Sequence, residues 1–164
     1  MHNRTVRRMG MRPGWLSRLL LGAGLALGAW AQPSPQLSTD DPVTFFNTLG
    51  GILLKSELNL DLKRLQVWPT NQYTPAAHRL LQLTANLYDA TTNRADAFGP
   101  LPTVFKPVFS REGATVFITN YVEVTGDSTA LLTQPRDLRD PADVAALQPN
   151  DNVYGVPWVL GAGK

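Results

Sequence analysis

The stretch between residues 68 and 90 constrains the fold most, because it holds the clearest helix start in the chain. Thr74 is a good N-cap residue, and Pro75 is favoured at the first helical position. Apolar side chains then recur at helical spacing and predict an amphipathic helix over residues 75–90. Its expected buried face consists of Ala76, Leu80, Leu83 and Leu87, widened by Tyr88.

Two further helices follow from start signals of the same kind. Asp41 and Pro42 predict a helix start, and Phe45, Leu49 and Leu53 continue an apolar stripe. Glycines 50 and 51 each cost about 1 kcal/mol relative to alanine, so we expect this helix to kink or end there. A short helix is expected after Asp140 and Pro141.

Alternating apolar residues predict the strands. Leu58, Leu60 and Leu62 indicate a half-buried strand over residues 58–62, and the change of parity at Leu65 predicts a bulge or break near residues 63–64. Residues 104–124 are typical of a hairpin, with Pro107 at an edge or irregular position. In its second strand one face is expected to carry Val116, Ile118, Val122 and Val124, and the other Phe117 and Tyr121.

The last predicted strand covers residues 153–160. Its apolar side chains are interrupted by Gly155 and Pro157, which favour the edge of a sheet. The fold class expected from these elements is α+β: a small mixed domain in which one principal helix packs on a short, largely antiparallel sheet.

The first residues have the three parts of a secretory signal. Arginines precede an apolar run over residues 19–30, which is shorter than the ~20 residues of a membrane-spanning helix. Ala29 and Ala31 then offer the small residues of a cleavage site. We therefore divide the chain into a signal peptide (1–31), an extended linker (32–40) and a single α+β domain (41–164), with retention of the leader as an anchor left open.

Charge and cysteine content exclude several function classes. Five of the 15 Lys and Arg residues lie in the leader, so the remainder has ten cations against 13 acids and no basic surface for nucleic acid. The chain contains no cysteine, which rules out disulfides and thiolate chemistry. An exported domain of this kind depends on its hydrophobic core for stability.

Catalytic and metal-binding patterns are weak. His78 is the only histidine outside the leader, and Asp89 or Glu123 would have to act as its partner in a hydrolase. The Gly126–Asp127–Ser128 sequence has no downstream histidine to serve as base, and the Gly161–Lys164 tail lacks the spacing of a phosphate loop. The carboxylates that could gather around calcium do not follow the EF-hand pattern; they are Asp137, Asp140, Asp143 and Asp151. We expect no catalytic residues, no bound metal and no cofactor.

Aromatic residues suggest ligand binding as an alternative to catalysis. Trp68, Tyr73, Tyr154 and Trp158 could line a ligand-binding groove, because such side chains give a large contact area at low entropic cost. Anchoring of loops and core is the competing interpretation.

Residues 68–93, 102–110 and 153–164 resemble the N-terminal region of the Verru_Chthon cassette protein A family. The resemblance implies a very large exported protein of verrucomicrobial bacteria, encoded beside smaller proteins with pilin-like N-termini, and it supplies no catalytic residues. The chain itself lacks the prepilin pattern of a glycine cleavage site with a glutamate five residues on, so we do not expect it to be a pilin-like subunit. Because it is shorter than such proteins, we expect it to be the N-terminal piece of a larger protein.

Three functional hypotheses follow. The first is an exported, non-enzymatic protein of the cell envelope or surface, located in the periplasm, at the cell surface or outside the cell, with pilin-like envelope proteins as partners. The second is a small secreted domain that binds a ligand through its aromatic loops. The third is a hydrolase centred on His78.

Overall fold

The computed structural model describes residues 37–92, 101–126 and 133–163 of the chain. The predicted signal peptide, with its cleavage site, and most of the predicted linker lie outside these residues. Within them, no helix is long and apolar enough to cross a membrane.

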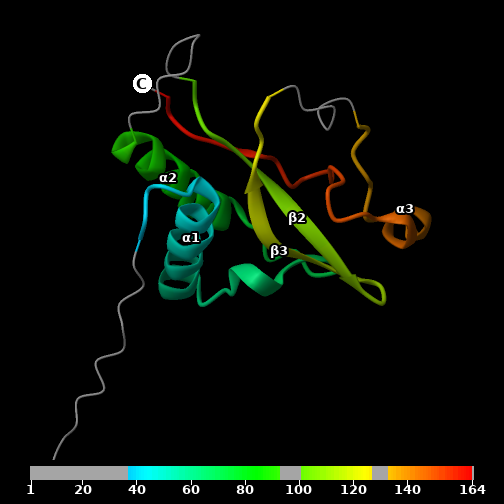
Figure 1. The fold of residues 1–164 in the computed structure, drawn as a ribbon. Coiled ribbons are helices and arrows are strands. Elements are labelled where there is room, and N and C mark those ends of the chain that lie inside the picture. The colour runs from blue at the N-terminus through cyan, green and yellow to red at the C-terminus, as the bar shows by residue number, and fades with distance from the viewer. Residues whose placement is uncertain (1–36, 93–100, 127–132, 164) are drawn as a thin grey trace, which may run out of the picture. The chain divides into compact units, whose positions relative to one another are not determined.

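The domain is a four-stranded antiparallel sheet with helices, so the predicted α+β fold class is confirmed (Figure 1). The strand order is β1-β3-β2-β4, and every neighbouring pair is antiparallel. In chain order the elements are α1 (Pro42–Leu58), the 3₁₀ turn η1 (Leu62–Arg64), β1 (Leu65–Trp68), α2 (Pro75–Thr91), β2 (Val104–Glu112), β3 (Thr115–Glu123), α3 (Pro141–Ala146) and β4 (Val159–Leu160).

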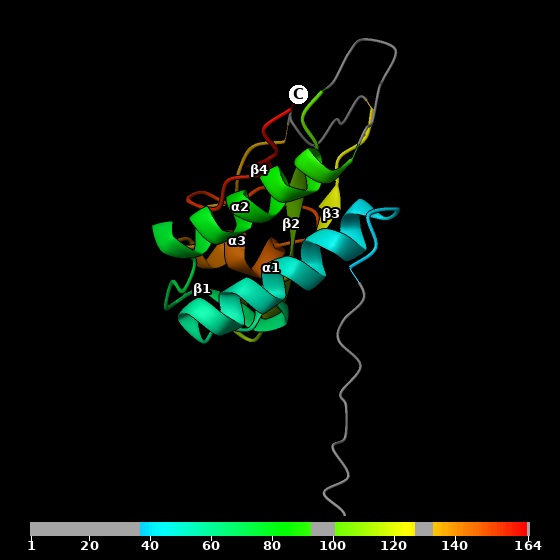
Figure 2. The same ribbon diagram turned by 90° about the vertical axis from the view of Figure 1, so that its left-hand side faces the viewer.

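Helices α1 and α2 lie side by side in front of β2 and β3 (Figure 2), and α3 lies on the other side of these strands (Figure 1). Aromatic rings join the helices to the sheet. Phe46 of α1 stacks on Phe105 of β2 with 4.1 Å between ring centroids, and Tyr88 of α2 meets the same ring edge-on. Phe46 also contacts Tyr121 of β3. The centre of the core is therefore aromatic.

Helix α1 begins as predicted and runs through both glycines. The side chain of Asp41 accepts a hydrogen bond from Val43 N, and the helix ends where Asn59 adopts a left-handed conformation. Gly50 is buried, and a Cβ there would lie 3.1 Å from Leu81 Cδ2 of α2. The prediction of an end at residues 50–51 is wrong, because the missing side chain at Gly50 allows close contact with α2.

The predicted strand over residues 58–62 is also wrong. Leu58 ends α1, and Leu62 begins η1. Leu58 and Leu60 pack against the core and Leu62 is buried, so a helix end and a turn bury the leucines that we assigned to a strand face. The predicted break near residues 63–64 coincides with η1, and the strand starts only at Leu65.

The predicted helix over residues 75–90 is present as α2, but its predicted buried face is only partly correct. Tyr88 is buried and Leu80 packs against the core, whereas Ala76 is exposed. Thr74 caps the helix by accepting a hydrogen bond from Ala77 N. Leu83 and Leu87 are 46% and 40% exposed. The buried face instead includes small side chains, which let α2 approach its neighbours closely; it is formed by Ala77, Leu81, Thr84, Ala85, Tyr88 and Asp89.

The predicted hairpin is present as β2 and β3, with a tight turn at Gly113, whose φ is +61°. The assignment of Tyr121 to the face opposite Val116 and Ile118 is wrong. The register shifts between Val108 and Phe109, so that Thr119 has no partner of its own, and this bulge returns Tyr121 to the helix-covered face. Tyr121, Val116 and Ile118 are all fully buried.

The other two predictions about strands and helices are confirmed in part. Helix α3 follows Asp140, which caps it. The strand predicted over residues 153–160 is reduced to β4, which lies at the edge of the sheet as expected. Pro107 lies in β2 beyond the two residues that pair with β4, so its missing N–H leaves no gap in a ladder.

Candidate functional site

A long open groove runs along the outer side of α1. Its volume is about 950 Å³. Two rows of residues spaced four apart on the helix form one wall. The first row is Val43, Asn47, Gly51 and Lys55, and the second is Thr44, Thr48, Ile52 and Ser56. Residues 60–63 and Asn120 form the rest of the lining. The rows span about 20 Å of helix.

The exposed surface of the groove is mainly apolar, although polar side chains such as Asn47 and Thr48 share the wall with Ile52, and charge lies at one end. Ile52 is 40% exposed, and Gly51 leaves space because a Cβ there would meet only Leu62 Cβ at 3.9 Å. Lys55 lies near the C-terminal end of α1, with Asp61 and Lys63 in the adjacent turn, so the lining carries one net positive charge. Small and apolar residues on one helix face allow another helix to pack closely.

Side-chain amides close the edges of the sheet. Beyond the end of β1, Asn47 bonds both backbone groups of Tyr121 in β3: its Nδ2 donates to the carbonyl and its Oδ1 accepts from the N–H, both at 2.8 Å. Gln72 closes β1 in a similar way, because its Oε1 accepts from Gln66 N and its backbone N donates to Gln66 O. The side chain of Gln82 reaches the carbonyl of Leu160 in β4. Addition of a partner strand is therefore disfavoured at these positions.

The structure does not gather the four predicted aromatic residues. Tyr73 is buried, at 5% exposure, and belongs to the core. Trp158 lies elsewhere and donates its indole N–H to Asn152 Oδ1 at 3.0 Å. Only Trp68 and Tyr154 share a pocket, whose volume is about 350 Å³. The predicted groove of four rings is thus reduced to a two-ring pocket.

His78 hydrogen-bonds to a core tyrosine. Its Nδ1 lies 2.8 Å from Tyr73 Oη. The carboxylate of Asp89, one of the predicted partners, instead accepts the backbone N–H groups of Thr103 and Gly163. Asp89 therefore anchors the residue before β2 and the segment after β4. Its carboxylate does not orient the imidazole of His78.

The two phenol groups of this region have raised pKa values because they are buried. Burial raises the pKa of Tyr73 to about 12 and raises the pKa of Tyr121 well above its ordinary value. The Tyr73 phenol contributes to the rise at Tyr121. Both groups are therefore neutral at physiological pH and suit a structural role.

The aspartates considered for calcium do not converge on a common point. Arg136 donates to Asp143 at 3.1 Å and to Asp151 at 3.0 Å. The pKa of Asp143 is lowered by the hydrogen bond from the backbone N–H of Asp137 and, to a smaller extent, by Arg136. Asp137 is bound by Arg139, which holds the pKa of Asp137 at about 2, and Asp140 caps α3. Among residues 37–92, 101–126 and 133–163, no cluster of three or more His, Asp or Glu side chains could hold a metal ion.

Lys106 is the buried cation of the domain's other face. It follows Phe105 in β2, and its ammonium contacts the carbonyl of Asn150 and lies 5.4 Å from the ring centre of Trp158. Burial lowers the pKa of Lys106, and the nearby carboxylate of Asp151 partly opposes this change. The contacts fix the segment before β4 on the sheet.

Sequence reasoning missed the groove, although α1 contained a signal for it. The polar residues of α1 ahead of Lys55 have short side chains and recur at helical spacing as Thr44, Asn47 and Thr48, and the apolar Ile52 follows on the same face. In the Gly126–Asp127–Ser128 sequence, which we did not assign as a nucleophile site, Asp127 and Ser128 lie outside the described residues.

Comparison with known proteins finds no matching family model, no matching curated protein and no matching solved structure.

Proposed function

We propose that this chain is an exported, non-enzymatic assembly protein of the cell envelope or surface, and that the groove along α1 holds an apolar helix of a pilin-like partner protein. The observation that carries the proposal is the groove itself, which combines a mainly apolar exposed surface, an exposed Ile52 and a positively charged end. The predicted leader and the resemblance to Verru_Chthon cassette protein A support export and a role in the envelope.

The form of the groove favours a helix as the occupant. Its residues follow α1 in straight rows, and Thr44, Thr48 and Gly51 keep the wall low, so that a second helix can approach. An extended strand would need unpaired backbone groups, but Asn47 already occupies those of Tyr121 at this edge. A helix satisfies its own backbone and needs only side-chain contacts.

The charge of the groove favours an acidic residue on that helix. Lys55 and Lys63 line the same end of the groove, with Asp61 between them in the chain. A glutamate on the apolar face of the incoming helix would pair with this end, whereas a lysine there would be repelled. Pilin-like N-termini carry a glutamate within an apolar helix, which is why we assign the partner to this class.

Fluorescence anisotropy with a labelled synthetic helical peptide tests the proposal. The peptide carries leucine and valine on one face and a single glutamate at one end of that face. We expect Ile52→Glu to weaken binding at least tenfold, because the new carboxylate is placed in an apolar wall. Leu87→Glu is the matched control: Leu87 is equally exposed but lies on α2 outside the groove.

A peptide in which lysine replaces the glutamate should bind more weakly, and the difference should shrink as salt is added. Equal loss of binding in the Ile52→Glu and Leu87→Glu variants would refute the location, and absence of binding by the unchanged protein would refute the proposed function.

A further inference from the structure

The second concave site lies where three loops meet beside β1. The pocket contains Trp68 at the end of β1, Asn71 in the following turn, Asp137 and Arg139 before α3, and Tyr154 before β4. Its volume of about 350 Å³ is at the lower end of the range for small-molecule sites. The pocket thus brings two aromatic residues and one ion pair together.

Hydrogen bonds hold these loops in place. Arg136 is central: its N–H donates to Asn152 O, and its carbonyl accepts from Tyr154 N at 3.0 Å. Its guanidinium binds Asp143 and Asp151, which fixes the loop before α3 to the loop before β4. Rigid aromatic residues lose little entropy on binding, so such a frame favours ligand recognition.

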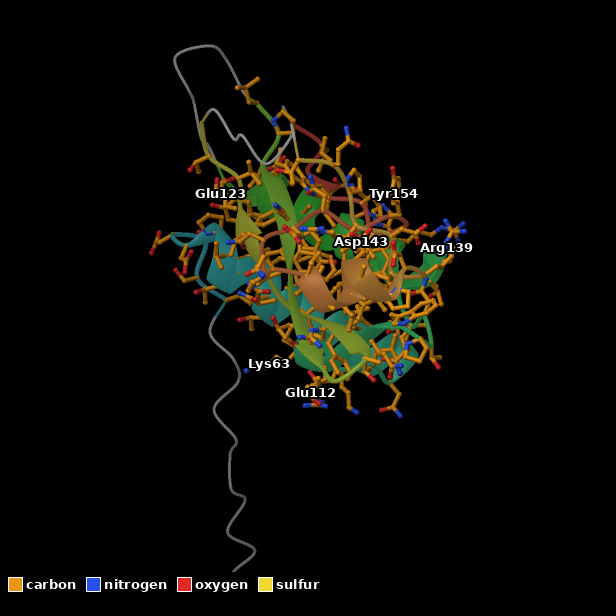
Figure 3. The ribbon with its side chains drawn as sticks, turned by 90° about the vertical axis from the view of Figure 1, so that its right-hand side faces the viewer. Lys63, Glu112, Glu123, Arg139, Asp143 and Tyr154 are labelled. Carbon is orange, nitrogen blue, oxygen red and sulfur yellow. The ribbon has the colours of Figure 1, made fainter. Side chains whose placement is uncertain are left out.

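The aromatic rings remain accessible. Tyr154 is 61% exposed, and Trp68 is half-buried with part of its ring packed on the core. Tyr154 and Arg139 project outward on the same side of the domain (Figure 3). Beneath them, the floor is made by three buried apolar side chains, those of Val67, Leu138 and Val156.

The polar groups in the pocket compensate each other in charge. Arg139 donates from both Nε and Nη2 to the carboxylate of Asp137, with the shortest contact at 2.6 Å. The backbone N–H of Arg139 also donates to Asp137, so three donors of Arg139 occupy most of the roughly four acceptor positions of this carboxylate. The guanidinium keeps N–H donors for a ligand, including those of Nη1. Asn71 uses its Oδ1 for Tyr73 N and retains its amide N–H groups.

These features fit one ligand chemistry. A neutral pair of charges attracts neither an anion nor a cation, but it offers donors and acceptors close together. A sugar ring has an apolar C–H face that packs on an aromatic ring, and neighbouring hydroxyl groups that both donate and accept. We propose that the pocket between Trp68 and Tyr154 binds a neutral sugar, with the ring against the aromatic side chains and its hydroxyl groups at Asp137 and Arg139.

A proline-rich peptide is the principal competitor, because aromatic grooves also bind such segments. Proline has no N–H, so it cannot donate to the remaining acceptor position of Asp137. The observations therefore favour the sugar, and the peptide becomes one outcome of the test.

Saturation-transfer NMR of the full chain with the methyl glycosides of glucose, galactose, mannose and N-acetylglucosamine tests the proposal. We expect at least one of them to bind with a Kd on the order of a millimolar. Tyr154→Ala should reduce its binding at least tenfold, and Tyr154→Phe should retain it, because the ring and not the hydroxyl makes the contact. Leu101→Ala, at an exposed residue outside the pocket, should change nothing.

Asp137→Asn provides a second check, since the loss of acceptor capacity should weaken binding while the rings stay in place. Absence of binding by all four glycosides would overturn the proposal. It would also be overturned by unchanged binding in Tyr154→Ala, or by a proline-rich peptide binding this pocket in place of the sugars. Ile52→Glu should leave sugar binding unchanged, so this result and that for the α1 groove can be separated.

Discussion

Adjacent glycines in α1 provide a test of how the two long helices pack. In a helix, alanine is favoured over glycine by about 0.8–1 kcal/mol per position. A Cβ at Gly51 would meet only Leu62 Cβ at 3.9 Å, which is an ordinary contact. Gly51→Ala should therefore stabilise the domain by about 1 kcal/mol, which corresponds to a rise in Tm of about 3–5 °C for a domain of this size.

The same change one residue earlier should not stabilise the domain. A Cβ at Gly50 would lie 3.1 Å from Leu81 Cδ2 and 3.7 Å from Thr84 Oγ1, so α2 would have to move. Overpacking of a core costs about 1–3 kcal/mol, which exceeds the gain in helix propensity. Gly50→Ala should thus be neutral or destabilise the domain by up to about 2 kcal/mol.

Urea denaturation followed by circular dichroism measures both variants under the same conditions. A double-mutant cycle with Leu81→Ala adds a control: removal of the Leu81 methyl groups should make Gly50→Ala less costly, with a coupling energy above about 0.5 kcal/mol. If Gly50→Ala stabilises as much as Gly51→Ala, the close contact between α1 and α2 is incorrect. If Gly51→Ala destabilises, the continuous helix through residue 51 is incorrect.

Three further predictions concern the polar groups. Asn47→Ala should destabilise the domain by about 2 kcal/mol in urea denaturation, because it leaves both backbone groups of Tyr121 unpaired, whereas an equal stability would mean that water replaces the amide without cost. The pKa of Asp137 is held at about 2 by Arg139, so this carboxylate stabilises the fold above its ordinary pKa near 3.8, and the contribution is lost as pH falls from about 4 to about 2. Asp137→Asn should make the free energy of unfolding depend less on pH over that interval. An unchanged pH dependence there would contradict the assignment. The pKa of Tyr73 is raised to about 12, so its neutral phenol stabilises the fold below pH 10 and the contribution is lost as pH rises through 12. Ultraviolet titration should show at least two tyrosines still neutral at pH 11, and one fewer in Tyr73→Phe. Ionisation of all four tyrosines below pH 11 would refute the buried position of Tyr73.

Helix start signals and composition were sufficient to predict much of the fold from the sequence. The Asp41, Thr74 and Asp140 caps correctly predicted the starts of all three helices, because a cap is a local interaction between a side chain and the next backbone N–H groups. The hairpin and the edge position of β4 were also predicted correctly, since both depend on short-range pattern and on glycine and proline.

The errors arose where tertiary packing decides. The alternating leucines at 58–62 fit a strand locally, but the left-handed Asn59 ends α1 there and a turn buries the leucines. The buried face of α2 was predicted from its leucines, whereas close packing against Gly50 selects small side chains. The bulge at Thr119 has no signature in the sequence, and it alone changes the face on which Tyr121 lies.

The candidate sites could be predicted only in part. Trp68 and Tyr154 were recognised as possible ligand contacts, but they are 86 positions apart in the chain, and their pairing follows from the Arg136 network. The α1 groove depends on where residues 60–63 run after the helix, which the erroneous strand assignment concealed. Its two rows of residues become visible only once α1 is known to continue to Leu58.

The most direct test of the proposed function is to map where the helical peptide binds. Amide chemical shifts of the isotope-labelled protein are recorded while the peptide with its leucine–valine face and single glutamate is added. We expect the largest changes in residues 43–56 and 60–63 and at Asn120, with little change at β1 or β4. Changes concentrated at the sheet edges or on the outer face of α2, or none at saturating peptide, would contradict it.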